Sequence, residues 1–324
     1  MYPTYLLITL VIYSIVFVIG FAGNISVIIT LLLILFDKSI TVRAKFKRVS
    51  FYVLLLSIVD LMVLSMLPLL VSYFHHGTWQ FGYIPCKIFW SIENVNKLLS
   101  VAILTVMSFE RYLGICRPLS HDALRHCNPG FVILFSLLFV SVLCTPIIYY
   151  SGTMDHVIRR PNETIIYAKV SCSADLPDNV LPYFICYMFV FAFVIPVIFI
   201  TLCYVFIIRN VNKTSNRGTV QGVFHLKQSH TVNPLVVVFH FICWTPFWAA
   251  VLLTLSNAPT LVGIFVSREV LAMIRLTASF LPYINCAGNW IFYAAFNREI
   301  QETSRELRLR HSRRIKNSAV VSQM

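Results

Sequence analysis

Charged side chains are scarce in this sequence. Asp, Glu, Lys and Arg make up only 12% of its 324 residues, and 13 residues in all are acidic. Hydrophobic residues reach 58%, and the mean hydropathy is +0.78. Because so few polar groups cannot cover the surface of a soluble domain of this length, the composition excludes one. We therefore predict an integral membrane protein.

Sequence patterns typical of enzymes are also missing. The chain has no His/Cys/Glu spacing for a metal, no glycine-rich loop for phosphates and no Ser-His-Asp set. His75 and His76 are interpreted as a pair at the membrane interface. We therefore expect no enzymatic activity.

A transporter or a channel is the alternative class of membrane protein. A transporter is typically built from two related halves with interrupted helices, and no internal repeat is visible here. A channel needs polar residues along several helices, whereas the polar residues of this chain gather in one small cluster. Both alternatives are therefore less favoured.

Seven apolar segments are each long enough for the roughly 20 residues that a membrane-spanning helix needs. They cover about residues 5–36, 49–74, 88–109, 131–150, 181–208, 235–255 and 269–296. The sequence predicts an all-α membrane protein, with a seven-transmembrane helix bundle over 1–296 and a cytoplasmic tail over 297–324. The tail is expected to begin with a short amphipathic helix at about 297–310.

Most of the 26 lysines and arginines follow the first, third, fifth and seventh segments. Because these residues favour the cytoplasmic side, we expect the N-terminus outside the plasma membrane and the C-terminus in the cytosol. The net charge of +13 then reflects orientation and attraction to anionic membrane lipid. Nucleic-acid binding need not be invoked.

Two of the nine cysteines, Cys86 and Cys172, remain on the oxidising outer side once those within helices or facing the cytosol are set aside. We expect them to form a disulfide between the third helix and the outer loop at about 151–180. The same loop contains Asn162 in an Asn-Glu-Thr sequence, which is a candidate glycosylation site.

A polar stripe runs along the third segment. Glu93, Asn96, Lys97 and Ser100 recur at spacings of three or four and so share one helix face. An acid at bilayer depth costs roughly 2.5 kcal/mol or more, which makes Glu93 a functional candidate. The alternative for Asn96 and Ser100 is hydrogen bonding between helices.

A second polar group is predicted deeper in the bundle. Asp60 is a lone acid in the second segment, and Asn285 and Asn289 lie one turn apart in the seventh. Because no lysine or arginine lies at a matching depth, a small cation held by oxygen ligands would neutralise Asp60.

Several short motifs, in helix order, resemble those of the rhodopsin-like (class A) G protein-coupled receptors. They are Gly23-Asn24, Ser57 to Leu61, Glu110-Arg111-Tyr112, Cys243 to Phe247 and Asn289 to Tyr293. Within that family, segments 100–108 and 202–208 look most like the somatostatin, opioid and allatostatin-C receptor group. The resemblance implies a neuropeptide receptor that signals through heterotrimeric G proteins of the inhibitory type. A small amine or a lipid is the alternative ligand.

The resemblance also implies roles for residues near the outer and central parts of the bundle. Glu93 matches an acid that pairs with a ligand's amine, the alternative being internal neutralisation by Lys97. The further ligand-binding candidates are Trp244, Phe247, Trp248, Arg275 and Tyr283. Asp60, Asn96, Ser100, Asn285 and Asn289 match an allosteric sodium site, and no other cofactor is expected.

At the cytosolic side, the resemblance implies that Arg111 pairs with Glu110 until activation and that Pro246 acts as a hinge beside Trp244. The residues implied in activation and coupling are Glu110, Arg111, Tyr112, Leu119, Tyr204, Pro246 and Tyr293. The expected partners are an extracellular peptide, a heterotrimeric G protein, arrestin and membrane lipid.

Two departures from the family pattern are informative. Trp290 stands where the family has a proline, so we expect a straighter seventh helix. No acid occurs between Asp178 and Glu269, so no carboxylate on the sixth helix can hold Arg111. Some activity without ligand is therefore our hypothesis.

Overall fold

The computed structural model describes residues 3–36, 44–117, 128–158, 167–215, 232–255, 268–296, 300–306 and 309. Leu119 and Asn162, for which roles are expected, lie outside these residues.

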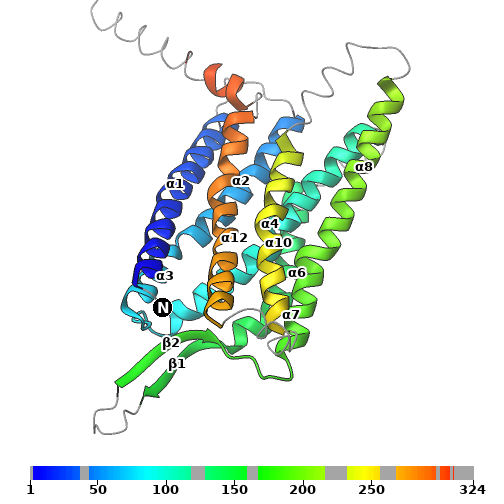
Figure 1. Ribbon diagram of the computed structural model, residues 1–324. Helices are drawn as coiled ribbons and strands as arrows, with labels where there is room; N and C mark the ends of the chain where they lie inside the picture. The colour runs from blue at the N-terminus through cyan, green and yellow to red at the C-terminus, as the bar shows by residue number, and fades with distance from the viewer. Residues whose placement is uncertain are drawn as a thin grey trace, which may run out of the picture.

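In the described part of the chain, seven helical segments run side by side as one bundle (Figure 1). They are α1 (Pro3–Phe36), α2 (Ala44–Leu64) with α3 (Leu67–His76), α4 (Tyr83–Cys116), α6 (Pro129–Tyr150), α7 (Leu181–Phe189) with α8 (Ile195–Ser215), α10 (Val232–Leu255) and α12 (Arg268–Phe296). Six segments are long and apolar enough to cross a membrane, and α12 packs against α1, α2 and α10 as the seventh. The predicted seven-helix bundle is confirmed.

Prolines mark the irregular points of two segments. The second segment breaks at residues 65–66, and Pro68 then lies in the first turn of α3, where its missing N–H costs nothing. This break was not predicted. In the fifth segment, a π-helical turn at Val190–Val194 ends two residues before Pro196, which removes a backbone donor from the helix.

The last two helices are continuous through their prolines. Pro246 lies inside α10, while Pro234 lies in its first turn, where it is tolerated. In α12 the proline is Pro282, two turns before Trp290, so the helix lacks one backbone donor at that point. This interruption was not predicted.

The outer loop differs from its prediction because it forms a hairpin. Strands β1 (Ser151–Ile158) and β2 (Tyr167–Ala174) are antiparallel, with Thr153 opposite Cys172. The expected disulfide between Cys86 and Cys172 is present and joins the hairpin to α4. The backbone N–H of Trp79 also donates to the carbonyl of Val170, at 2.8 Å. The hairpin is thus fixed at one end of the bundle, and the short helix at 300–306 lies at the opposite end (Figure 1).

Helices α1 and α12 approach each other closely because α1 carries glycines on the facing side. A Cβ atom on Gly20 would lie 2.7 Å from Cβ of Ala287, and one on Gly23 would lie 2.2 Å from Nε1 of Trp290. Beside them, the amide of Asn24 donates to the carbonyl of Cys286 at 3.0 Å. Because Gly20 and Gly23 have no side chains, α1 and α12 can pack closely and the indole of Trp290 fits against Gly23.

Candidate functional site

A chain of hydrogen bonds crosses the middle of the bundle from α2 to α10. Asn289 Nδ2 donates to Asp60 Oδ2 at 2.9 Å, and Asn285 Nδ2 donates to Asn289 Oδ1 at 3.4 Å. Asn285 Oδ1 accepts from the Trp244 indole at 3.3 Å and lies 3.1 Å from Nδ1 of His240. All five side chains are buried. Polar contacts thus couple three helices where little water can compete.

The remaining two cation candidates form a neighbouring group on α4. Ser100 Oγ donates to Asn96 Oδ1 at 2.7 Å, and Asn96 Nδ2 lies 3.6 Å from Sγ of Cys286. Both residues are buried. The structure therefore brings the five predicted residues into two hydrogen-bonded groups, with Cys286 of α12 between them.

The free oxygens of these groups decide what they can bind. Asp60 Oδ1 is buried and has no hydrogen-bond partner among the described residues. By contrast, Asn285 Oδ1 is turned toward Trp244 and His240. Asp60 Oδ1 is therefore the oxygen most open to a cation, since the amide oxygens of Asn96, Asn285 and Asn289 each already accept a hydrogen bond.

His240 is a functional candidate that the sequence analysis missed. It lies within an aromatic stretch of α10, where a single histidine gives no signal of its own. Its imidazole is 1% exposed and packs 5.6 Å from the ring of Trp244, measured between centroids. Only the contact with Asn285 of α12 reveals its connection to the polar chain.

Nearer the hairpin end, Glu93 of α4 contacts α12. Its Oε1 accepts a hydrogen bond from the hydroxyl of Tyr283 at 2.6 Å. Glu93 and Lys97 interact electrostatically, but they form no ion pair within 4.0 Å. The ammonium of Lys97 instead lies 5.3 Å from the ring centroid of Phe247. The structure therefore shows no direct ion pair between Lys97 and Glu93.

Aromatic side chains of α10 and α7 pack beside this pair. Phe247 lies 5.4 Å from both Trp244 and Trp248, and Trp248 lies 5.5 Å from Phe189, measured between ring centroids. Arg275, in contrast, is exposed on α12. Six of the seven predicted ligand-binding residues thus lie on the facing parts of α4, α10 and α12, next to an apolar aromatic group.

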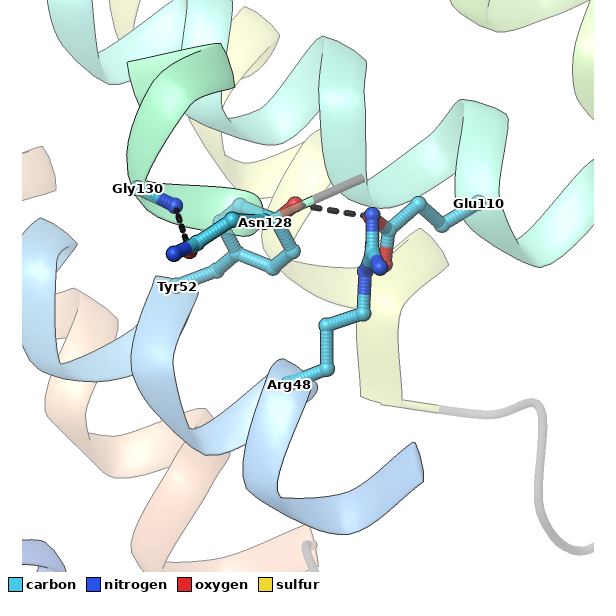
Figure 2. A network of polar contacts seen from close by, with 5 residues as sticks. All are labelled: Arg48, Tyr52, Glu110, Asn128 and Gly130. Atoms are coloured by element: carbon cyan, nitrogen blue, oxygen red, sulfur yellow. Dashed lines mark hydrogen bonds and ion pairs between the residues drawn. The ribbon is translucent and has the colours of Figure 1, made fainter. Parts of the chain in front are cut away.

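At the other end of the bundle, the predicted pair between Glu110 and Arg111 is not formed. Glu110 Oε1 instead accepts from Nε of Arg48 at 2.6 Å and from the hydroxyl of Tyr52 at 2.7 Å (Figure 2). Arg48 and Tyr52 lie one turn apart on α2, so both reach the same carboxylate of α4. Sequence neighbours on a helix point in different directions, which is why the prediction was wrong.

Arg111 lines a cavity of about 910 Å³ between α8 and α10. Tyr204 of α8 and Pro246 of α10 line the same cavity, whose other walls are mostly apolar. The hydroxyls of Tyr204 and Tyr293 are buried, and neither has a hydrogen-bond partner among the described residues. Tyr112 packs on Phe206 of α8, with 5.9 Å between ring centroids.

Removing Arg48 should destabilise the fold. The side chains of Arg48 and Glu110 are only 14% and 13% exposed. Arg48→Gln leaves a mostly buried carboxylate without its cation, so we expect the apparent melting temperature of the purified protein to fall by about 5 °C. The control is Lys47→Gln, which removes an exposed neighbouring charge and should change the melting temperature by about 1 °C or less. Equal shifts in both variants would contradict this role of the ion pair.

Comparison of the sequence with known proteins identifies its family. The model of the family described as 7 transmembrane receptor (rhodopsin family) matches residues 23–293. The chain therefore belongs to the rhodopsin family of seven-transmembrane receptors.

Individual relatives agree with this assignment. The chain is 31% identical over 307 residues to a probable G-protein coupled receptor of Caenorhabditis elegans, with 91% of this chain and 67% of the relative covered. It is 30% identical over 319 residues to neuropeptide receptor 18 of the same organism, with 89% and 64% covered. It is 30% identical over 293 residues to somatostatin receptor type 2 of Mus musculus, with 87% and 72% covered. The chain thus spans about two thirds of the length of the two nematode relatives.

Proposed function

We propose that this receptor binds an extracellular peptide and signals through a heterotrimeric G protein. In this proposal the hairpin end of the bundle lies outside the plasma membrane. Residues 297–324 form a tail in the cytosol, where arrestin is a further partner. The observation that supports the proposal is the cavity of about 910 Å³ between α8 and α10, which is lined by Arg111.

The chemistry of the outer end supports a peptide with a cationic group. Glu93 has a carboxylate on the hairpin side of the bundle. This carboxylate accepts a hydrogen bond from Tyr283 and forms no direct ion pair with Lys97. A ligand amine could pair with it where water is largely excluded, which strengthens the interaction. The aromatic group of Trp244, Phe247 and Trp248 would contact apolar side chains of the same peptide. Two of the relatives described above are named as a neuropeptide receptor and a somatostatin receptor.

The polar chain supports transmission between the two ends. Trp244 belongs to the proposed peptide site and is linked through Asn285 and Asn289 to Asp60. A ligand that moves Trp244 must rearrange these buried hydrogen bonds and with them the contact between α10 and α12. The G protein would then bind only the arrangement in which α10 has moved outward.

The direct test uses the purified receptor in lipid nanodiscs with purified inhibitory G protein. Cationic and cyclic peptides are first screened on cells that report cyclic AMP. Peptides that lower cyclic AMP should then speed nucleotide exchange on the G protein in nanodiscs. Peptide binding without any acceleration of exchange would refute the signalling role, and solute flux in liposomes without G protein would indicate a transporter.

Sodium is the cofactor that we propose for the central group. Asp60, Ser100, Asn96 and Asn289 would hold it, because these residues supply a carboxylate with one unused oxygen and nearby hydroxyl and amide oxygens. Bound sodium would supply a positive charge that stabilises one arrangement of the helices. Agonist affinity should therefore fall several-fold when sodium replaces potassium, by the usual size of allosteric coupling, about 1–3 kcal/mol.

Asp60→Asn should abolish this sodium effect while keeping a hydrogen-bonding side chain for Asn289. The measurement is agonist binding in sodium against potassium at equal ionic strength. Asp155→Asn is a matched control, since Asp155 is exposed on β1. A sodium response that is unchanged in Asp60→Asn would exclude the site.

A further inference from the structure

Lys97 places a positive charge inside the hairpin half of the bundle. Its ammonium donates to Oδ1 of Asn94 at 3.4 Å and lies 5.3 Å from the ring centroid of Phe247. Among the described residues it forms no ion pair within 4.0 Å. A cation in apolar surroundings is costly when one long hydrogen bond and an aromatic face are its main contacts. The amine that pairs with Glu93 leaves this second charge unexplained.

Lys97 and Glu93 reach different neighbours although they lie one turn apart on α4. Glu93 contacts Tyr283 of α12. Lys97 contacts Phe247 of α10 and interacts electrostatically with Cys144 of α6. Neither charged side chain is fully buried, so space for a water-sized molecule adjoins both. Because a helix rises about 1.5 Å per residue, Lys97 lies about 6 Å further from the hairpin end than Glu93 does.

A buried hydrogen-bond donor without an acceptor lies beside Phe247. The side chain of Trp248 is 4% exposed, and its Nε1 has no hydrogen-bond partner among the described residues. The rings of Phe247 and Trp248 are 5.4 Å apart between centroids, and Trp248 packs in the same apolar cluster as Cys144. Lys97 and Trp248 therefore share two neighbours. An ammonium without an anion and an N–H without an acceptor would both be satisfied by an anionic oxygen.

We propose that Lys97 and the indole N–H of Trp248 form a subsite for a carboxylate of the peptide, deeper in the bundle than the amine that pairs with Glu93. The preferred peptide then carries both an acidic and a cationic group, separated along the bundle by about 6 Å. The carboxylate belongs to an acidic side chain or to the C-terminus. This inference rests on the proposed function, because it concerns the same peptide.

The probes are synthetic randomised hexapeptides, made with free and with amidated C-termini and selected on the purified receptor in nanodiscs. Mass spectrometry identifies the binders, and those that lose affinity in Glu93→Gln are resynthesised with Asn for Asp, Gln for Glu, or an amide for the terminal carboxylate. We expect one of these changes to lower the affinity of each binder about tenfold or more. A loss on amidation assigns the carboxylate to the C-terminus, and a loss on Asn or Gln substitution assigns it to a side chain.

Receptor variants locate the effect. Lys97→Gln should weaken the acidic peptide about tenfold or more but should not weaken its neutralised form, so the two changes are not additive. Trp248→Phe keeps an aromatic ring and removes the N–H, and it should weaken the acidic peptide more than the neutralised one. Lys169→Gln removes an exposed lysine of β2 and should leave both peptides unaffected.

Two results would overturn the carboxylate subsite while leaving the peptide receptor intact. One is that the selected peptides keep their affinity after every neutralisation, which is measured on the unaltered receptor and so does not depend on the folding of a variant. The other is that neutralisation costs as much in Lys97→Gln as in the unaltered receptor. A selection that returns no binding peptide would instead contradict the proposed function and this inference together.

Discussion

Replacing Gly23 by valine should largely prevent this receptor from folding. A Cβ atom at this position would lie 2.2 Å from the indole nitrogen of Trp290, far inside van der Waals contact. The atoms in the way belong to the bulky indole ring of Trp290 on the neighbouring helix. A valine at position 23 would therefore push α1 away from α12. We expect a loss of about 3 kcal/mol or more, the upper end for overpacking, and a large fall in surface expression and in melting temperature.

A matched set of variants isolates the contact. Ala22→Val adds the same side chain to the exposed face of α1 and should have little effect. Trp290→Ala destabilises by itself but removes the clash, so Gly23→Val should cost much less in that background, with a coupling of about 2 kcal/mol. Additive effects of the two substitutions would show that Gly23 and Trp290 do not share this space.

Glu93→Gln should reduce the affinity of a lysine-bearing peptide agonist about 100-fold. Breaking a buried charge pair typically costs about 2–5 kcal/mol, and each 1.4 kcal/mol corresponds to a factor of ten in affinity. The glutamine can still accept the hydrogen bond from Tyr283, so the contact between α4 and α12 is retained. Radioligand competition on membranes measures the change.

The same peptide with norleucine in place of lysine is the informative control. It should already bind weakly and should lose little more affinity in Glu93→Gln. Glu302→Gln, at an exposed acid of the short helix, should leave both peptides unaffected. If both peptides lose affinity equally in Glu93→Gln, the glutamate supports the fold of the site and is not the partner of the amine.

The bundle and much of its polar interior could be predicted from the sequence because the membrane restricts the choices. A long apolar segment has almost no alternative to a helix in lipid, and a buried polar stripe must face other helices. For this reason Asp60, Asn285 and Asn289 could be assigned to one polar group, and Cys86 could be paired with Cys172. The structure agrees with both.

Other features depend on the relative rotation of helices, which one sequence does not determine. The partner of Glu110 is Arg48 because α2 turns that face toward α4. His240 contacts Asn285 only through the packing of α10 on α12. The hairpin was missed because its strands pair only with each other and carry no long apolar pattern.

The anchoring of Glu110 has a consequence for the energetics of signalling. The cation of that cluster, Arg48, lies on α2 and its acid, Glu110, lies on α4, while the described residues of α10 take part in no ion pair. If α10 is the wall that opens, its displacement breaks no ionic bond and requires no solvation of a released charge. The resting state is then favoured chiefly by apolar packing and by the link through Asn285, so the balance between the two states should respond little to the ionic strength of the cytosol.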